Sequence, residues 1–222
     1  MTPFHHERLS KLLMDYVNIP RSKLNDEKLR ECLQSVSSDN AYQVLRTVVN
    51  HLEHTAVYLA ARRNQPETLK RLLNSVTAES RYQLLTVQNV DGATPLHDAT
   101  YCGWTDVVVC IYNSITAKQR YQLLTIQAMF GHTTLHYAAW QGRTELSALL
   151  LDSVVPAQQM QLLSIGNING DTAIDVARKW GNLLTADEIA KYKVQGTATD
   201  YGKHLSYFTL NILKNRYSLL KI

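Results

Sequence analysis

Apolar residues in the middle of the chain fall into short clusters with helical spacing. Between positions 90 and 128, the first cluster places Leu96, Ala99 and Thr100 at i, i+3 and i+4, which is one face of a helix. Two more clusters follow in the same stretch: Val107, Val108, Cys110 and Ile111, and then Tyr121, Leu123 and Leu124. Gly103 lies between the first two clusters, and Thr116 precedes the third. The pattern therefore predicts three consecutive short helices whose apolar residues are buried.

This pattern recurs along the chain with a fixed period. The phrase Arg-Tyr-Gln-Leu-Leu-Thr occupies Arg81–Thr86 and recurs at Arg120–Thr125, so the two starts differ by 120 − 81 = 39 in the numbering. Gln159–Ser164 is a drifted third copy at the same spacing (159 − 120 = 39). Turn glycines keep this spacing too, at Gly92, Gly131 and Gly170. A period of this length is typical of stacked copies of one supersecondary unit, each burying its apolar faces against its neighbours.

We therefore predict one all-α repeat domain over residues 1–222. Its expected parts are a degenerate first unit (1–50), three clear units (51–89, 90–128 and 129–167), a degenerate unit (168–192) and a C-terminal helical cap (193–222). The cap is predicted from apolar residues at helical spacing, among them Leu205, Phe208, Ile212, Leu213 and Leu219. Degenerate end units are expected because they must present a polar outer face to water.

The residues that begin and end the first helix of each unit are also predictable. Thr94 is a good N-cap, and Pro95 is tolerated in the first turn because its missing N–H has no partner there. Gly103 ends the helix. In the unit 51–89, Glu53 replaces the turn glycine and Asn64 replaces the helix-ending one; asparagine can still adopt the left-handed conformation.

Composition narrows the class of protein without identifying its chemistry. Of the 222 residues, 45% are hydrophobic and 19% are charged, which is ordinary for a folded protein. The net charge of +4 is small for a nucleic-acid binder, so we expect no nucleic acid as partner. Three cysteines without metal-type spacing favour a reducing compartment. Neither a secretory signal nor a membrane span is expected, because no sufficiently long apolar stretch occurs.

The repeated motif resembles that of a known family. The string Gly-x-Thr-x-Leu-His-x-Ala, at Gly92–Ala99 and again at Gly131–Ala138, followed by an aliphatic helix, resembles the ankyrin repeat over about residues 51–182. The ankyrin period is about 33 residues, and here the surplus falls after the second helix. Repeats of this longer kind resemble those of large arrays in invertebrates and bacteria, including proteins delivered into host cells.

The resemblance implies roles for the threonine and the histidine of the motif. In the family, the threonine hydroxyl caps the helix and bonds the histidine, which ties neighbouring turns together. These roles carry over to Thr94 with His97 and to Thr133 with His136. The pairing is expected to fail in two units, where Tyr58 follows Thr55 and Asp175 follows Thr172.

The resemblance also implies a concave groove lined by turn tips and by the ends of the first helices. The helix-end positions recur with the 39-residue period, at Arg62, Arg63, Tyr101, Cys102, Trp140, Gln141, Lys179 and Trp180. The turn tips contribute Asp91 and Phe130, with His54 and His132 just after them. Aromatic and arginine side chains at such positions are typical of an interaction surface, although aromatics can instead pack on neighbouring repeats.

We therefore predict a monomeric, cytoplasmic scaffold or adaptor that binds another protein, is not an enzyme and needs no cofactor or metal. Two alternatives stay open: an effector acting on a host protein, and a targeting module for an enzyme whose activity lies outside the repeats. The weaker chemical signals are a zinc site at His51 and His54, a reactive thiol at Cys102 beside Asp98 and His97, and a basic cluster at Arg62, Arg63, Lys70 and Arg71. The first is more simply explained by turn-tip histidines, the second by a histidine engaged in its turn, and the third by a solvated helix face.

Overall fold

The regular structure of the chain is helical. The computed structural model describes residue 15, residues 37–47 and residues 52–195, and over this part it holds twelve α-helices, one 3-10 helix and no strand. The predicted all-α class is therefore confirmed for the described residues. Most of the predicted first unit (1–50) and of the predicted C-terminal cap (193–222) lies outside them. No described helix has the length and apolar character that a membrane span requires.

The described chain divides into two compact units. Unit 1 comprises the residues up to 119 together with 127–129, and unit 2 comprises 120–126 together with the residues from 130 onward. The helices of unit 1 are α3 (Ser38–Leu45), α4 (Ala56–Arg62), α5 (Pro66–Asn74), α6 (Ala78–Leu85), α7 (Pro95–Cys102) and α8 (Thr105–Ser114). The division falls inside α9 (Ala117–Leu124). The helices of unit 2 are η2 (Met129–Gly131, of which Met129 is assigned to unit 1), α10 (Thr134–Trp140), α11 (Thr144–Asp152), α12 (Pro156–Ser164), α13 (Ala173–Lys179) and α14 (Leu183–Gln195).

The starting points of the helices repeat with the period of the sequence. α4, α7, α10 and α13 begin at residues 56, 95, 134 and 173, so successive starts differ by 39 (95 − 56, 134 − 95 and 173 − 134). α5, α8, α11 and α14 begin at 66, 105, 144 and 183, again 39 apart. α6, α9 and α12 begin at 78, 117 and 156. Each of the first three stretches thus contains a first, a second and a third helix in the same order, and the described part of the fourth contains a first and a second helix.

The predicted helix ends are confirmed. Pro95 is the first residue of α7, and Gly103 caps its C-terminus with φ 83°, in the left-handed region. Asn64 (φ 54°) adopts the left-handed conformation that was expected of an asparagine there, and Glu53 (φ 58°), which replaces the turn glycine, is left-handed too. Such a conformation costs most residues of order 1–3 kcal/mol. The surrounding unit must therefore hold Glu53 in place.

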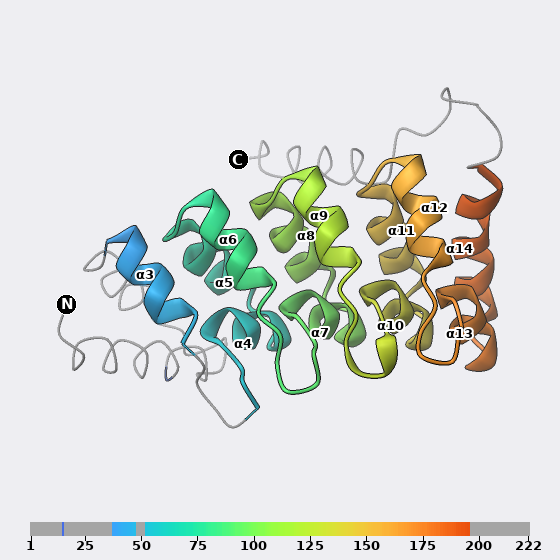
Figure 1. Cartoon of the computed structure of the whole chain (residues 1–222), viewed down its shortest axis with the longest axis horizontal. Helices are drawn as coiled ribbons and strands as arrows, with labels where there is room; N and C mark the ends of the chain where they lie inside the picture. The colour runs from blue at the N-terminus through green and yellow to red at the C-terminus, as the bar shows by residue number, and fades with distance from the viewer. Residues whose placement is uncertain (1–14, 16–36, 48–51, 196–222) are drawn as a thin grey trace, which may run out of the picture. The chain divides into compact units, whose positions relative to one another are not determined.

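In unit 1, the first helices of neighbouring repeats pack on each other, and so do the second helices. α4 packs against α7 and α5 packs against α8, while α4 also contacts α5 and α7 contacts α8 (Figure 1). The turn tips are joined through the backbone, because the Val90 N–H donates to the Leu52 carbonyl at 3.3 Å and the Met129 N–H donates to the Asp91 carbonyl at 2.7 Å. The apolar faces thus meet between neighbouring helices while the backbone links the turns.

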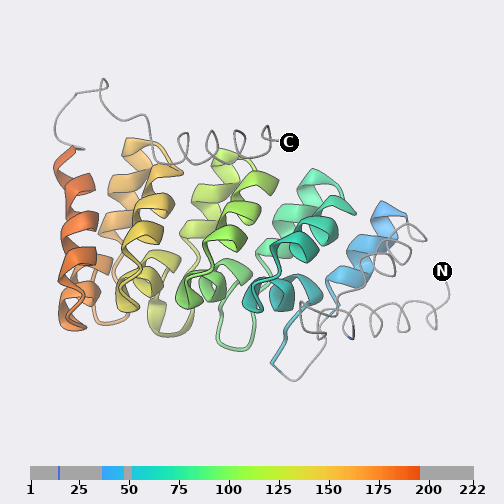
Figure 2. The same cartoon turned by 180° about the vertical axis from the view of Figure 1, so that it is seen from behind.

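Unit 2 repeats this arrangement by itself. α10 packs against α13 and α11 against α14, and α12 also contacts α14; Figure 2 shows these helices from behind. The Ile168 N–H donates to the Phe130 carbonyl at 3.0 Å, which is the same bond between turn tips as in unit 1.

Two residues expected in the core are only half-buried. The Tyr121 hydroxyl lies near the surface, where it donates to Oε1 of Gln161 at 2.7 Å. The Cys110 thiol lies 3.5 Å from the Pro66 carbonyl, and burial raises the pKa of the thiol to about 11. The other residues of the predicted apolar clusters are buried: Leu96, Ala99, Thr100, Val107, Val108, Ile111, Leu123 and Leu124.

A buried histidine links two turns of unit 2. Nδ1 of His136 accepts from the Thr133 N–H at 3.2 Å, and its Nε2 lies 3.0 Å from the Asp171 carbonyl oxygen. A carbonyl oxygen can only accept, so Nε2 carries the proton and the imidazole is neutral. The expected tie between neighbouring turns is therefore present at His136.

The two units in which this pairing was expected to fail have substitutes for the histidine. Oδ2 of Asp175 accepts from the Thr172 N–H at 3.0 Å and from the Thr172 hydroxyl at 2.6 Å, so the carboxylate replaces the imidazole as the cap. Tyr58 instead replaces the link to the next turn, because its hydroxyl accepts from Nδ2 of Asn89 at 2.9 Å. Each substitute thus keeps one of the two histidine functions.

Replacing Leu135 by alanine tests which face of α10 is the core face. Leu135 is fully buried, so Leu135→Ala is expected to lower the free energy of unfolding by about 2–5 kcal/mol in urea denaturation. The matched control Val155→Ala removes an exposed side chain in the same unit and should change stability by less than about 0.5 kcal/mol. A wild-type unfolding curve for Leu135→Ala would show that α10 is inverted.

The His136 link also predicts how stability depends on pH. Burial lowers the pKa of His136 from 6.5 to about 4. As the pH falls, His136 is protonated near pH 6.5 in the unfolded chain but only near pH 4 in the folded chain. The contribution of neutral, buried His136 to the free energy of unfolding is therefore complete above pH 6.5 and is lost as the pH falls toward 4. The loss is at most about 1.4 kcal/mol per pH unit.

The measurement is urea denaturation at about pH 7 and about pH 5, comparing the wild type with His136→Gln. The variant has no imidazole at this position, so its stability should fall less between the two pH values, even if it is less stable at both. Equal losses in the two proteins would contradict the proposed role of His136.

Candidate partner-binding surface

The helix-end positions picked out by the sequence occupy the same structural place in every first helix. Arg62, Tyr101 with Cys102, Trp140 and Lys179 end α4, α7, α10 and α13. Arg63, Gln141 and Trp180 are the C-caps that follow α4, α10 and α13. The 39-residue period thus places one pair of the predicted contact residues at the C-terminal end of each first helix.

The ends of two of these helices are held by a donor from the next stretch of the chain. In unit 1, Nε1 of Trp104 donates to the Arg62 carbonyl at 3.2 Å. In unit 2, Nδ2 of Asn182 donates to the Trp140 carbonyl at 2.8 Å and to the Ala139 carbonyl at 3.0 Å. Trp104 and Asn182 are separated by two periods of the repeat (182 − 104 = 78). The bonds satisfy carbonyls that a helix C-terminus leaves without an intrahelical partner, and they fix the backbone beneath the candidate side chains.

Aromatic side chains remain accessible in both units. Tyr101 is 39% exposed in unit 1, while Phe130 is 61% and Trp180 is 62% exposed in unit 2. Phe130 also has a left-handed backbone (φ 60°), an uncommon conformation for a bulky residue, and its ring gains little burial in return. Strain of this kind is concentrated at functional sites. Arg62, Arg63, Asp91 and Lys179 are exposed as well.

Some of the predicted contact residues are less accessible than expected. His54 is only 3% exposed, so its expected place on the surface is wrong. Its ring stacks on Tyr58 with centroids 4.4 Å apart, and burial lowers its pKa. Cys102, His132, Trp140 and Gln141 are half-buried, and each can offer only part of its side chain to a partner.

Behind Arg62, unit 1 contains a polar network that the sequence did not reveal. Nη1 of Arg62 lies 3.3 Å from Oδ2 of Asp98, and Asp98 accepts a hydrogen bond from the Tyr58 hydroxyl. Tyr58 accepts in turn from Asn89. Burial raises the pKa of Asp98, although the Tyr58 hydroxyl and the Arg62 charge oppose the shift. The signal for this network was the tyrosine standing where other units have histidine.

In unit 2, four aromatic rings form a cluster, which we call the aromatic cluster: His132, Tyr137, Trp140 and Trp180. The Trp140 ring is central, since its centroid lies 5.4 Å from that of Trp180, 6.0 Å from that of His132 and 6.1 Å from that of Tyr137. Tilted and edge-on contacts at such distances stabilise aromatic pairs by about 0.5–1.5 kcal/mol. Trp140 was predicted to line the groove, with packing on neighbouring repeats as the alternative; its ring contacts support that packing, and its removal would take these contacts away.

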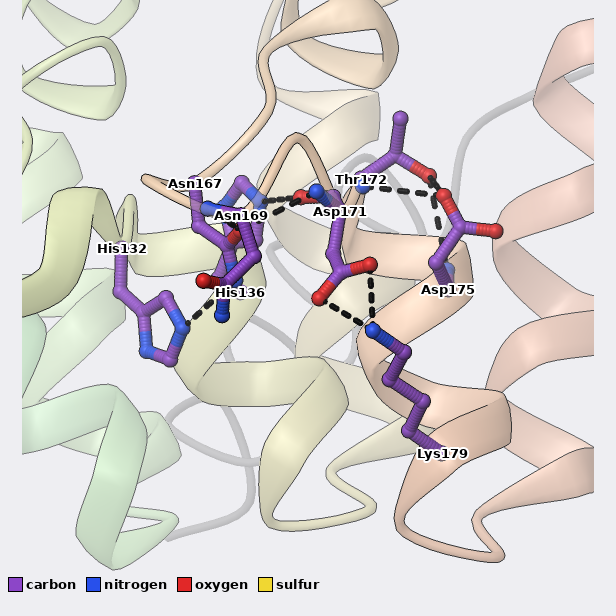
Figure 3. A network of polar contacts seen from close by, with 8 residues as sticks. All are labelled: His132, His136, Asn167, Asn169, Asp171, Thr172, Asp175 and Lys179. Carbon is purple, nitrogen blue, oxygen red and sulfur yellow. Dashed lines mark hydrogen bonds and ion pairs between the residues drawn. The ribbon is translucent and has the colours of Figure 1, made fainter.

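A polar network borders the aromatic cluster (Figure 3). Nδ2 of Asn167 lies 3.1 Å from Nε2 of His132, while the Asn167 side-chain oxygen accepts from the Asn169 and Asp171 N–H groups. Nζ of Lys179 lies 2.6 Å from both carboxylate oxygens of Asp171. The turn that carries Asp171 is thus fixed from both sides, and Lys179 is held in one place.

The alternative chemical sites find little support. Within the described ranges, no group of three or more His, Cys, Asp or Glu side chains is placed to hold a metal ion; His51 itself lies outside those ranges. Nδ1 of His97 accepts from the Thr94 N–H at 3.2 Å, so this nitrogen is engaged and is not a base for the Cys102 thiol. In the basic cluster, Arg62 is paired with Asp98.

Comparison with protein-family models gives no match for the chain, and comparison with curated proteins gives no significant relative.

Replacing Tyr58 by phenylalanine tests the network of unit 1. The change leaves the Asn89 amide and the Asp98 carboxylate without the hydroxyl between them, and it should lower the free energy of unfolding by about 1–3 kcal/mol. Combining it with Asn89→Ala should cost less than the sum of the two single changes, because both remove the same bond. Additive losses in urea denaturation would contradict the shared bond.

Proposed function

We propose that the chain is an ankyrin-like repeat array that binds another protein. The array is supported by helix starts at a 39-residue spacing and by the packing of first helices on first helices within each unit. It is supported further by the threonine–histidine contact of the motif, in which Oγ1 of Thr94 lies 2.8 Å from Nδ1 of His97 and Oγ1 of Thr133 lies 2.7 Å from Nδ1 of His136. Repeat arrays of this kind present extended surfaces for binding.

One observation carries the functional proposal. The repeat commits the apolar residues of each first helix to packing, yet it leaves the helix end and the turn tip accessible, and large aromatic residues occupy these places. Tyr101, Phe130 and Trp180 are all at least 39% exposed. Exposed aromatics near charged residues of the same unit are typical of binding sites, because such side chains bury much area while fixing few rotatable bonds.

The proposed mechanism is rigid presentation. Trp140 is ordered by its ring contacts, and Arg62 and Lys179 are ordered by ion pairs with Asp98 and Asp171. Little side-chain entropy is then lost when a partner binds, so more of the contact energy contributes to affinity. Aromatic rings would anchor the partner, and the charged side chains beside them would select its orientation. We further propose that the protein is monomeric and acts in a reducing cytoplasm, either its own cell's or a host's.

The test compares proteins captured by the full chain with those captured by the double variant Tyr101→Ala/Phe130→Ala. Both side chains are exposed, so the variant should fold normally. A captured partner, once purified, should bind the double variant at least about 30-fold more weakly, which corresponds to about 2 kcal/mol. The control Gln83→Ala/Gln122→Ala changes two exposed residues of the third helices and should bind like the wild type. Equal affinity of the wild type and the aromatic variant for every captured protein would refute the proposal.

A further inference from the structure

Three turn tips of unit 1 expose a row of apolar side chains. Leu52 is 38% exposed, Val90 is 51% exposed and Met129 is 44% exposed. We call these three residues the tip row. Val90 and Met129 occupy the same position of the repeat (129 − 90 = 39), and Ile168, one period further on in unit 2, is 69% exposed. An aliphatic residue whose side chain faces water in each of these three copies is not explained by packing within the array.

Backbone hydrogen bonds bring the members of the tip row close together. The Val90 N–H donates to the Leu52 carbonyl at 3.3 Å, and the Met129 N–H donates to the Asp91 carbonyl at 2.7 Å. Backbones joined in this way lie about 5 Å apart. The three apolar side chains therefore start from neighbouring backbones. An extended segment of about five residues, at about 3.3 Å per residue, is long enough to cover the row.

Two carboxylates lie beside the tip row, and each comes one residue after a member of it. They belong to Glu53 and Asp91, and both side chains are exposed. Neither forms an ion pair with another residue in the described part of the chain, whereas Asp98 of the same unit is paired with Arg62 at 3.3 Å. The apolar row is thus bordered by negative charge that the described residues do not neutralise.

Other exposed carboxylates of unit 1 have a local role that these two lack. Glu67 and Asp106 lie in the first turns of α5 and α8, where a negative charge offsets the helix dipole. Glu53 and Asp91 lie before the N-caps of α4 and α7, outside any helix. The dipole effect is confined to the first turn, so it does not account for the charges beside the tip row.

The backbone at Glu53 is better suited to glycine. The equivalent residues of the later copies are Gly92, Gly131 and Gly170, with φ values of 70°, 73° and 79°. Glu53 adopts the same left-handed conformation (φ 58°) although its Cβ makes that conformation unfavourable. The first copy therefore keeps a glutamate where glycine would be more stable, which agrees with a use of its carboxylate outside the fold.

We propose that the tip row docks a short extended segment of the partner protein that carries both aliphatic and basic side chains. Its aliphatic side chains pack on Leu52, Val90 and Met129, and its lysine or arginine side chains pair with Glu53 and Asp91. The long stem of a lysine or arginine lets its charge reach a carboxylate at the side of the row while the aliphatic side chains face the row. This inference rests on the proposed function, because it names the chemistry of the partner that the array binds.

The test is binding of short fluorescent peptides to the full chain, measured by anisotropy at low salt. The peptides are alike except that valine alternates with lysine, with serine or with glutamate. The lysine peptide should bind about fivefold more tightly than the serine peptide, and the glutamate peptide should bind most weakly. The net charge of the whole chain is +4 and by itself favours the glutamate peptide, so the expected order requires the two carboxylates.

Two double variants separate the carboxylates of the tips from other negative charge. Glu53→Gly/Asp91→Asn should bind the lysine and serine peptides equally. Glycine relieves the left-handed backbone, so Glu53→Gly alone should melt no lower than the wild type, and the lost preference is then not a loss of folding. The matched control Glu67→Gln/Asp106→Asn removes two carboxylates at helix starts of the same unit and should keep the preference.

Several outcomes would overturn the inference. They are no binding of the lysine peptide, tighter binding of the glutamate peptide, equal binding of the lysine and serine peptides by the wild type, and an unchanged preference in Glu53→Gly/Asp91→Asn. A two-chain mass by light scattering that falls to one chain in Val90→Ser would assign the row to a second copy instead. If a captured partner requires Tyr101 and Phe130 but binds Glu53→Gly/Asp91→Asn like the wild type, this inference fails while the proposed function stands.

Discussion

Every helix in the described part of this chain depends on its neighbours, because none of these helices is long enough to be stable alone. The described α-helices have between 7 and 13 residues, whereas isolated helices shorter than about 12–15 residues are marginal in water. Their stability must come from packing one apolar face on the next. This need for packing explains the 39-residue period. Because each copy carries its apolar residues at the same positions, each helix can pack against the matching helix of a neighbouring copy. The positions at the helix ends and turn tips take little part in this packing, so their residues can differ between copies. Aromatic and charged residues occupy many of these positions.

Polar links between turns hold the repeated layers in register. The same place is occupied by Tyr58 in one copy, by His136 in another and by Asp175 in a third, and each makes a different subset of the bonds. Histidine does both tasks because its two nitrogens point in opposite directions, one to the cap and one to the next turn. Tyrosine reaches the next turn only, and aspartate is too short to leave its own cap. No single side chain is required at this place. Each of the three side chains makes the helix cap, the link to the next turn, or both.

The sequence predicted the helices and their ends well because those features are set locally. Periodic apolar residues, the proline of α7 and the left-handed asparagine at position 64 each have a local physical cause, and each is found where expected. Accessibility was harder to predict, since it depends on which neighbouring side chain fills the space. His54 was expected on the surface but stacks on Tyr58, and Trp140 is half-covered by rings from three other positions. The Arg62–Asp98–Tyr58–Asn89 network was missed because its members come from three separate stretches of sequence.

The central claim is that the residues left out of the packing, at helix ends and turn tips, are the ones that meet a partner. The most direct measurement is site-specific photo-crosslinking in the cells that make the protein, with the crosslinking residue placed at Tyr101 or Phe130 in one set and at Gln83 or Gln122 in the other. The account predicts that the first set crosslinks to one and the same partner and that the second set does not. The same partner captured with equal yield from Gln83 and Gln122, or no partner from Tyr101 and Phe130, would contradict it.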